Sequence, residues 1–260
     1  MFPGLAHMLE HMIFMGSNQF PNENDIEHYL SANGGYSNAT TECEYTMYEL
    51  MVERRSLRGA IERFSSAFIN PLLSQSSIEQ EIEPIDIEFV SAITDDNVRC
   101  QLLLTQIANR QHPASKFLWG NRRSLIESKS NERKQDIREQ LIKFFNDHYR
   151  SNNIVVIVQS QESLENLHNW TCEMFSKIPV SRNTNIISPK LISAPAFEQE
   201  QFHRLYRMES IDNGTQLLIS WLMSPIISDY QSSPINYLST ISLDFYCSRF
   251  VTIIVAGRLC

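Results

Sequence analysis

The sequence lacks the features that define several large classes of protein. It has no apolar run of 18 residues, so we expect neither a membrane-spanning helix nor a membrane partner. Its 30 acidic side chains outnumber the 22 basic ones, and a net charge of −8 disfavours nucleic acid, whose phosphates are bound by clustered cations. The first residues contain no basic n-region and no cleavage site, which excludes a secretory signal peptide there.

Cysteine and glycine are also scarce. The five cysteines, at positions 43, 100, 172, 247 and 260, are odd in number and widely spaced, so we predict buried thiols and no disulfide framework. Free thiols without a signal peptide predict a cytoplasmic location. Only eight glycines occur, and four of them lie within the first 35 residues, where they mark the ends of the first two predicted helices.

The apolar residues are numerous enough for a sizeable core, at 42% of 260 residues. Their spacing alternates between helical and strand periods along the chain, which predicts an α+β fold with a layered sheet and packed helices. A capping box of Ser76 and Glu79 opens one of the helices, and the β-branched run 154–158 predicts a buried strand. The predicted helices are 2–15, 24–33, 57–68, 76–95, 132–149, 164–178 and 234–247, and the predicted strands are 37–52, 154–158 and 216–223.

The first of these helices carries an H-x-x-E-H motif, which is the reverse of the zincin motif H-E-x-x-H. Four residues separate His7 from His11, about 40° around a helix axis, so both imidazoles can share one tetrahedral Zn²⁺. Glu10 lies close to such a metal on the same face, where a general base takes a proton from a metal-bound water. A third ligand, most commonly a carboxylate, must come from elsewhere in the chain.

The pentapeptide alone leaves an alternative open. Three fixed residue types at this spacing arise by chance in roughly one in a hundred chains of this length. A histidine on an apolar helix is then a hydrogen-bonded core residue and not a ligand. Other segments of the chain must therefore decide between zinc-binding histidines and hydrogen-bonded core histidines.

Four segments extend the motif in a fixed order. Residues 3–17 (PGLAHMLEHMIFMGS) surround it, residues 81–88 (EIEPIDIE) begin and end with a glutamate, and residues 109–121 (NRQHPASKFLWGN) and 144–149 (FFNDHY) follow. Together these segments closely resemble the M16 (pitrilysin, or inverzincin) metallopeptidases. The resemblance runs from about residue 3 to about residue 245.

The resemblance implies a role for each matching residue. His7 and His11 are the histidine ligands of one Zn²⁺ per chain, and Glu88, 77 residues after His11, is the carboxylate ligand. Glu10 is the base that activates water for attack on the scissile carbonyl. Glu81 lies two helical turns before Glu88 on the same face and orients a ligand. From spacing alone, Glu81 on a solvated helix face remains the alternative.

The resemblance also implies residues that contact the substrate. Asn38 and Ala39 match the edge strand on which an extended peptide is laid, by main-chain hydrogen bonds. Asn38 in a plain turn is the alternative. Phe14 matches a residue that lines the substrate pocket, although an aromatic side chain on a buried helix also suits a core. Pro84 lies between Glu81 and Glu88, and we expect it to kink the helix there. Such a kink would shift Glu88 from the histidines unless tertiary packing holds it.

The implied architecture is a LuxS/M16-type metallopeptidase domain followed by part of a second similar domain. Residues 1–180 would form the N-terminal zinc peptidase domain without its first strands, 181–197 a polar linker, and 198–260 an incomplete second domain. Full members of the family have four homologous domains in two halves, so we interpret the chain as truncated at both ends. We therefore expect it to bind zinc but to cleave peptides poorly.

The leading functional prediction is a zinc metalloendopeptidase module that acts on small or medium peptides. Its partners would be peptide substrates, together with the C-terminal half of the family or a homologous chain. One alternative is a catalytically weak or inactive truncated M16 protein that binds peptides or a full-length relative. Another is an unrelated α+β domain with a chance motif, which the additional matching segments disfavour.

Overall fold

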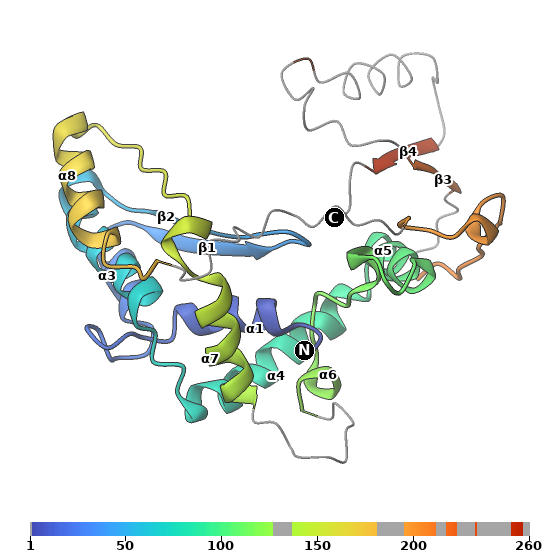
Figure 1. Cartoon of the computed structure of the whole chain (residues 1–260), viewed down its shortest axis with the longest axis horizontal. Coiled ribbons are helices and arrows are strands. Elements are labelled where there is room, and N and C mark those ends of the chain that lie inside the picture. The colour runs from blue at the N-terminus through green and yellow to red at the C-terminus, as the bar shows by residue number, and fades with distance from the viewer. Residues whose placement is uncertain are drawn as a thin grey trace. The chain divides into compact units, whose positions relative to one another are not determined.

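The structure is a computed structural model that describes residues 2–126, 137–180, 195–211, 217–222, 232 and 251–256 (Figure 1). The chain divides into two compact units. The first unit consists of Met1–Ala92 and Phe117–Leu191, and it contains every residue for which the sequence predicts a role. The second consists of Ile93–Lys116 and Ile192–Cys260.

The described elements mix helices with short strands, as the sequence predicts for an α+β fold. Those of the first unit are α1 (Leu5–Ile13), α2 (Asp25–Ala32), β1 (Tyr36–Thr41), β2 (Thr46–Met51), η1 (Arg54–Ser56), α3 (Leu57–Ile69), α4 (Gln75–Ala92), α6 (Arg122–Ile126), α7 (Ile137–His148), η3 (Ser151–Asn153) and α8 (Leu164–Phe175). Those of the second unit are α5 (Asp96–Ile107), η2 (Pro113–Ser115), η4 (Gln199–Gln201), β3 (Leu217–Leu222) and β4 (Val251–Ala256).

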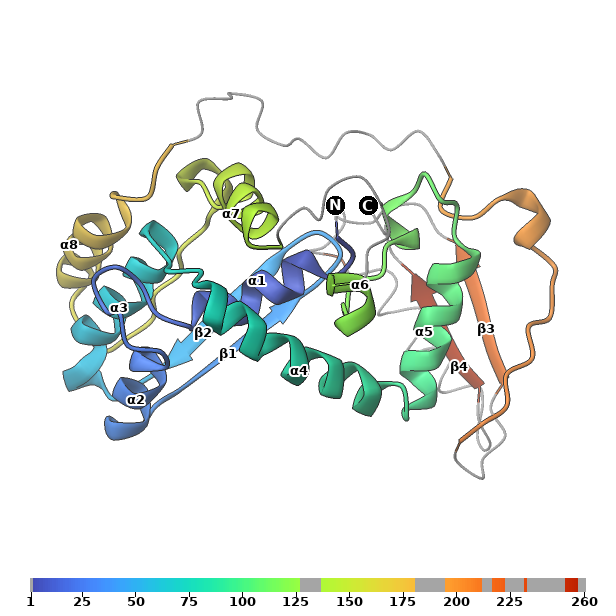
Figure 2. The same cartoon turned by 90° about the horizontal axis from the view of Figure 1, so that it is seen from below.

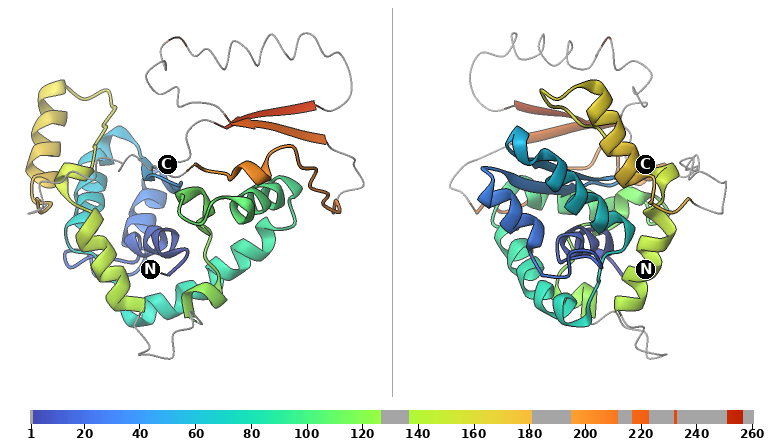
Figure 3. Two further views of the ribbon diagram at one scale, coloured as in Figure 1. Left: turned by 45° about the vertical axis from the view of Figure 1, so that its right-hand side comes forward. Right: turned by 90° about the vertical axis from the view of Figure 1, so that its left-hand side faces the viewer.

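Helix α1 is the central helix of the first unit. The hairpin of β1 and β2 covers one side of it and α4 the other, as Figures 1 and 2 show from two directions. Helix α7 also packs against α1 (Figure 3). Helix α1 carries apolar residues on most faces, as the sequence predicts for a buried helix, and the surrounding elements cover them.

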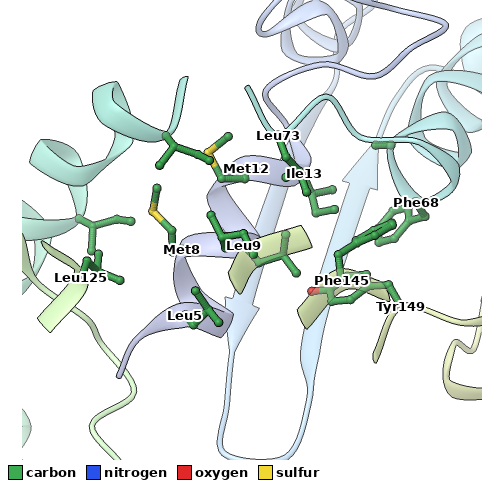
Figure 4. Packing of buried hydrophobic residues seen from close by; sticks show 14 of the residues in the cluster. Leu5, Met8, Leu9, Met12, Ile13, Phe68, Leu73, Leu125, Phe145 and Tyr149 are labelled. Atoms are coloured by element: carbon green, nitrogen blue, oxygen red, sulfur yellow. The ribbon is translucent and has the colours of Figure 1, made fainter. Parts of the chain in front are cut away.

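The main core forms around the apolar side chains of α1 (Figure 4). Met8, Leu9 and Met12 are fully buried, and each such side chain contributes about 1.5–3 kcal/mol through removal from water. Other elements complete the cluster with side chains that include Phe68, Leu73, Ile78, Ile82, Ile85, Leu125, Leu141, Phe145 and Tyr149. This packing fixes the position of α1 and therefore of the polar residues on it.

The predicted strand 37–52 is an antiparallel hairpin and not a single strand. Tyr36 pairs with Met51 and Thr41 with Thr46, so residues 42–45 form the connection. Burial alternates along both strands, and the half-buried positions of β1 and β2 face α1. The alternation of Cys43, Glu44 and Tyr45 continues the strand period across the turn, which is why the sequence pattern does not mark it.

The β-branched run 154–158 is not the buried strand that its composition predicts. The structure assigns it no strand, and the side chains of Val155 and Ile157 are 86% and 88% exposed. Ile154 and Val158 pack partly against the apolar clusters. Burial therefore alternates along the run as it does along a strand. A β-branched composition favours an extended backbone, but it does not specify a neighbouring strand for hydrogen bonding.

Helix α4 begins two residues earlier than the predicted capping box. The Ser74 hydroxyl, not that of Ser76, accepts the amide hydrogen of Ser77 at 3.0 Å, and Glu79 accepts a hydrogen bond from Gln75. The helix continues through Pro84 to residue 92. Helices α5 and α6 were not predicted; α5 has no buried residue, so it lacks the apolar stripe on which a helix prediction depends.

The second unit is described in separate pieces. Asp95 caps α5 by accepting the amide hydrogen of Asn97 at 2.7 Å. Strands β3 and β4 pair in parallel, with Leu217 opposite Val251, and β3 matches the predicted strand 216–223. The predicted helix 234–247 and most of the predicted linker 181–197 lie outside the described residues, so the predicted domain boundaries stay a prediction.

Two expectations from composition can be compared with the described residues. Cys43 and Cys100 are only partly buried and Cys172 is exposed, so the prediction of buried thiols is wrong for these three. Their positions in a turn and on solvent-facing helices explain this exposure. In the part of the chain that is described, no helix is both long enough and apolar enough to cross a membrane.

The start of α1 crosses the segment before α6 at two glycines. Gly4 caps α1 with a left-handed backbone, φ 84°, and Gly120 has φ 72°. A Cβ atom on Gly4 would lie 2.1 Å from the Gly120 Cα, which is far inside van der Waals contact. Only two glycines allow this approach of one backbone to another.

We expect Gly4→Ala to destabilise the chain by more than the about 1–2 kcal/mol of left-handed backbone strain, because the two backbones must also separate. Gly34→Ala is the matched control: Gly34 also has a left-handed backbone, φ 66°, but its Cβ would meet only the Glu53 side chain, at 3.2 Å. Urea unfolding measures both variants. Equal losses in the two variants would contradict a tight crossing at Gly4.

Candidate metal centre

Helix α1 places both histidines of the motif on one face. The imidazole centroids of His7 and His11 are 4.9 Å apart and the rings are nearly perpendicular, at 83°. His7 is 9% exposed, and Glu10 between them is 8% exposed. Because a buried ionisable group is costly without a partner, each of the three needs a neighbour from another element.

Helix α4 brings Glu88 to the two histidines despite Pro84. The Glu88 Oε2 lies 3.5 Å from His7 Nε2 and 3.6 Å from His11 Nε2. Ligand atoms of His7, His11 and Glu88 all lie within 4.8 Å of one another. Of the two outcomes that the sequence leaves open for Pro84, the structure has the one in which Glu88 stays beside the histidines.

These separations fit a zinc ion. Zn–N and Zn–O bonds of about 2.0–2.1 Å in a tetrahedron place neighbouring ligand atoms about 3.4 Å apart. The two nitrogen-to-oxygen distances at Glu88 are close to this value and longer than ordinary hydrogen bonds. The Glu88 side chain is 45% exposed, so this ligand is accessible from solvent, whereas His7 is buried.

The second ring nitrogen of each histidine has its own partner. His7 Nδ1 lies 2.6 Å from the carbonyl oxygen of Trp119, and only an N–H at this nitrogen can make that hydrogen bond. His11 Nδ1 lies 3.0 Å from the Glu81 Oε2. In both rings this arrangement leaves Nε2 free to bind a metal and holds the ring in position.

Glu81 is partly buried beside His11 and does not lie on a solvated helix face. Its side chain is 13% exposed and faces His11. Two helical turns separate it from Glu88, and both carboxylates point toward the same imidazole. That Glu81 orients a ligand stays a prediction.

The carboxylates also control the charge of His11. Burial disfavours its imidazolium, but hydrogen bonds and charge interactions with Glu81 and Glu88 outweigh burial and raise the His11 pKa to about 9. The interaction with His11 lowers the pKa of Glu88. Glu81 and Glu88 thus stabilise a positive charge between them.

Glu10 faces the hairpin. One of its carboxylate oxygens accepts a hydrogen bond from the Thr41 hydroxyl, at the end of β1. This contact brings the end of β1 next to the residue that the sequence predicts as the base.

The predicted substrate residues lie in two different environments. Asn38 is exposed on β1 and its amide reaches Glu49 across the hairpin at 3.5 Å, while Ala39 pairs with Tyr48. Phe14 packs against Tyr48, with ring centroids 5.9 Å apart, and belongs to a core cluster. The structure thus puts Asn38 and Ala39 in a strand, and their contact with substrate stays a prediction.

Sequence reasoning did not single out Trp119 or Thr41. Trp119 acts through its backbone carbonyl, which no side-chain pattern reveals, although it lies in the matching segment 109–121. Thr41 is one of two adjacent threonines, and only the hairpin register shows that it faces α1. Contacts of this kind depend on elements far apart in the sequence.

Two family models match the chain in sequence. The model described as "Insulinase (Peptidase family M16)" matches residues 2–121, and the one described as "Peptidase M16 inactive domain" matches residues 136–259. A nardilysin-like protein of Arabidopsis thaliana is 38% identical over 91% of this chain and 22% of its own length. The insulin-degrading enzyme of Mus musculus is 35% identical over 91% of the chain and 23% of its own length.

The fold is similar to solved structures as well. A crystal structure of pitrilysin, 32% identical, matches with a TM-score of 0.63 over 68% of this chain and 19% of its own. A protease from Helicobacter pylori, 19% identical, shares the fold with a TM-score of 0.60 over 72% of this chain and 43% of its own. The chain spans about a fifth of the length of the curated relatives it matches. On both sequence and fold, the chain belongs to peptidase family M16.

Proposed function

We propose that the chain is a zinc metalloendopeptidase module that hydrolyses small or medium peptides. The observation that carries this proposal is that one Glu88 oxygen lies 3.5 Å and 3.6 Å from the Nε2 atoms of His7 and His11, on a helix that also carries the buried Glu10. Membership of a peptidase family supports the reaction class. The three ligands leave one tetrahedral position open, as catalytic zinc sites require.

A zinc ion held by His7, His11 and Glu88 would supply a Lewis acid that lowers the pKa of water to about 7. Glu10 lies on the same helix face, where its carboxylate can accept the proton of the attacking water. The same group can then deliver that proton to the amine that leaves the scissile bond. The carboxylate is held by Thr41 through one oxygen, which leaves the other for this exchange.

The surrounding groups hold the ligands in position. The Trp119 carbonyl fixes the His7 ring and Glu81 fixes the His11 ring. Both ring partners act at Nδ1, so neither competes for the metal-binding nitrogen. The anionic pair Glu81 and Glu88 also favours a divalent cation at this site.

The peptide would bind as an added strand at the edge of β1. Among the described residues, β1 pairs only with β2, so its other edge has backbone groups without a neighbouring strand. Asn38 and Ala39 lie on this strand, and Thr41 at its end contacts Glu10. A peptide extended along β1 would therefore pass close to the base.

We expect about one zinc ion per chain after dialysis against buffered zinc, measured by atomic absorption. His7→Ala and Glu88→Gln should each lower this content strongly, because a tetrahedral site loses one of three protein ligands. Glu10→Gln should keep the metal, because Glu10 is not a ligand.

His28→Ala is the control for the loss of a histidine, since His28 is exposed on α2. Its zinc content should equal that of the parent chain. Full zinc occupancy in His7→Ala would rule out the proposed ligand set.

We expect the zinc-loaded chain to cleave a fluorescence-quenched peptide, slowly, and Glu10→Gln to lower the rate by at least about a hundredfold, because the amide cannot accept a proton. A chelator should abolish cleavage in the parent chain. The assay compares the parent, Glu10→Gln and His28→Ala at equal zinc content.

A rate unchanged by Glu10→Gln would refute the role of this residue. Binding of the peptide by a zinc-loaded parent that does not hydrolyse it would instead support the alternative of a peptide-binding protein. Fluorescence anisotropy of a labelled peptide measures binding, and the cleavage assay measures hydrolysis. Together they distinguish a peptidase from a protein that only binds peptides.

A further inference from the structure

Four hydroxyl groups lie between Glu10 and the core of the first unit. Thr41 donates to the Glu10 carboxylate, and its oxygen lies 3.2 Å from the hydroxyl oxygen of Thr46. Thr46 is also close enough to Tyr149 to lower the pKa of that phenol. The Tyr149 hydroxyl in turn lies 2.7 Å from that of Tyr48. The set thus links α1, both strands of the hairpin and the residue that follows α7.

The contact with the carboxylate sets the direction of the next hydrogen bond. Thr41 donates its single hydrogen to Glu10, so toward Thr46 it can only accept. Thr46 is therefore the donor of the bond between the two threonines. The Thr41 hydroxyl is thus engaged on both sides.

Burial keeps the two nearby phenols, Tyr48 and Tyr149, protonated. It raises the pKa of Tyr149 to about 12 and that of Tyr48 well above its usual value, and the negative charge of Glu10 contributes to both. Stacking of Tyr149 on Phe145 and Phe68 holds its ring in place. The Tyr149 hydroxyl is thus fixed by ring packing as well as by its hydrogen bond with Tyr48.

From this geometry we infer that Thr41 is a positioning residue for Glu10, itself held in place by Thr46. The inference rests on the proposed role of Glu10 as the base. Thr41 holds one carboxylate oxygen against the hairpin and thereby limits the orientations of the carboxylate. Without the Thr41 hydroxyl, the Glu10 side chain can rotate away from this position.

A positioning role makes a prediction that a purely structural role does not. Thr41→Val keeps the shape of the side chain but removes its hydroxyl, so we expect kcat to fall about ten- to a hundredfold, as for groups that support a catalytic residue. KM and zinc content should stay close to those of the parent, because Thr41 binds neither peptide nor metal through this hydroxyl. Thr41→Ser restores the hydroxyl and should recover most of kcat.

Thr171→Val is the matched control, since it makes the same chemical change on α8, outside this set of hydroxyls. We expect its kcat and KM to equal those of the parent. Parent-like kcat in Thr41→Val, or no recovery in Thr41→Ser, would overturn the inference while leaving the proposed function intact.

A second measurement does not depend on activity. The experiment measures the thermal midpoint of unfolding in the zinc-free chain. Made alone, Thr41→Val should lower this midpoint by several degrees. Added to Glu10→Ala, it should lower the midpoint by clearly less, because the Thr41 hydroxyl then has no carboxylate to bind. Equal shifts in both backgrounds would show that the two side chains are not coupled. If the zinc-loaded parent does not cleave peptide, only the proposed function is refuted. The comparison of thermal midpoints would still decide whether Thr41 holds Glu10.

Discussion

One constraint organises the first unit: three ionisable side chains lie on the buried helix α1, and each needs a polar partner from a distant segment. Burial of such a group without a partner costs several kcal/mol, more than most single contacts contribute. The carbonyl of Trp119 meets His7, the Thr41 hydroxyl meets Glu10 and the Glu81 carboxylate meets His11. Among the described residues, no fully buried side-chain nitrogen or oxygen lacks a hydrogen-bond partner. The polar partners of α1 therefore hold the fold together at the same places where they define the site.

The same partners separate the roles of atoms within each side chain. In both histidines Nδ1 is used by the protein and Nε2 faces Glu88. In Glu10 one oxygen is held by Thr41, and the other remains for a proton. The two glycines that let the backbones cross near His7 serve this arrangement, because they allow the Trp119 carbonyl to reach the imidazole. Packing and the polar site are thus coupled through short contacts.

Local patterns in the sequence predict much of this fold. The helix that carries the motif, the helix that carries Glu81 and Glu88, and the α+β class all follow from periodicity and from the matching segments. The hairpin turn was missed because residues 43–45 continue the strand alternation. The run 154–158 was misassigned because a β-branched composition indicates a tendency to extend but does not specify a neighbouring strand. Helix α5 was missed because it buries no residue and shows no apolar stripe.

By itself, the sequence determined which residue types the site contains: a four-residue spacing puts two imidazoles on one helix face whatever surrounds them. It also determined the family, through several separated segments in one order. Only the tertiary structure decided that Glu88 reaches both histidines in spite of Pro84, that Glu81 faces His11, and that Thr41 holds Glu10. These contacts join residues 31 to 81 positions apart. Their geometry depends on how whole elements pack, and no local spacing encodes it.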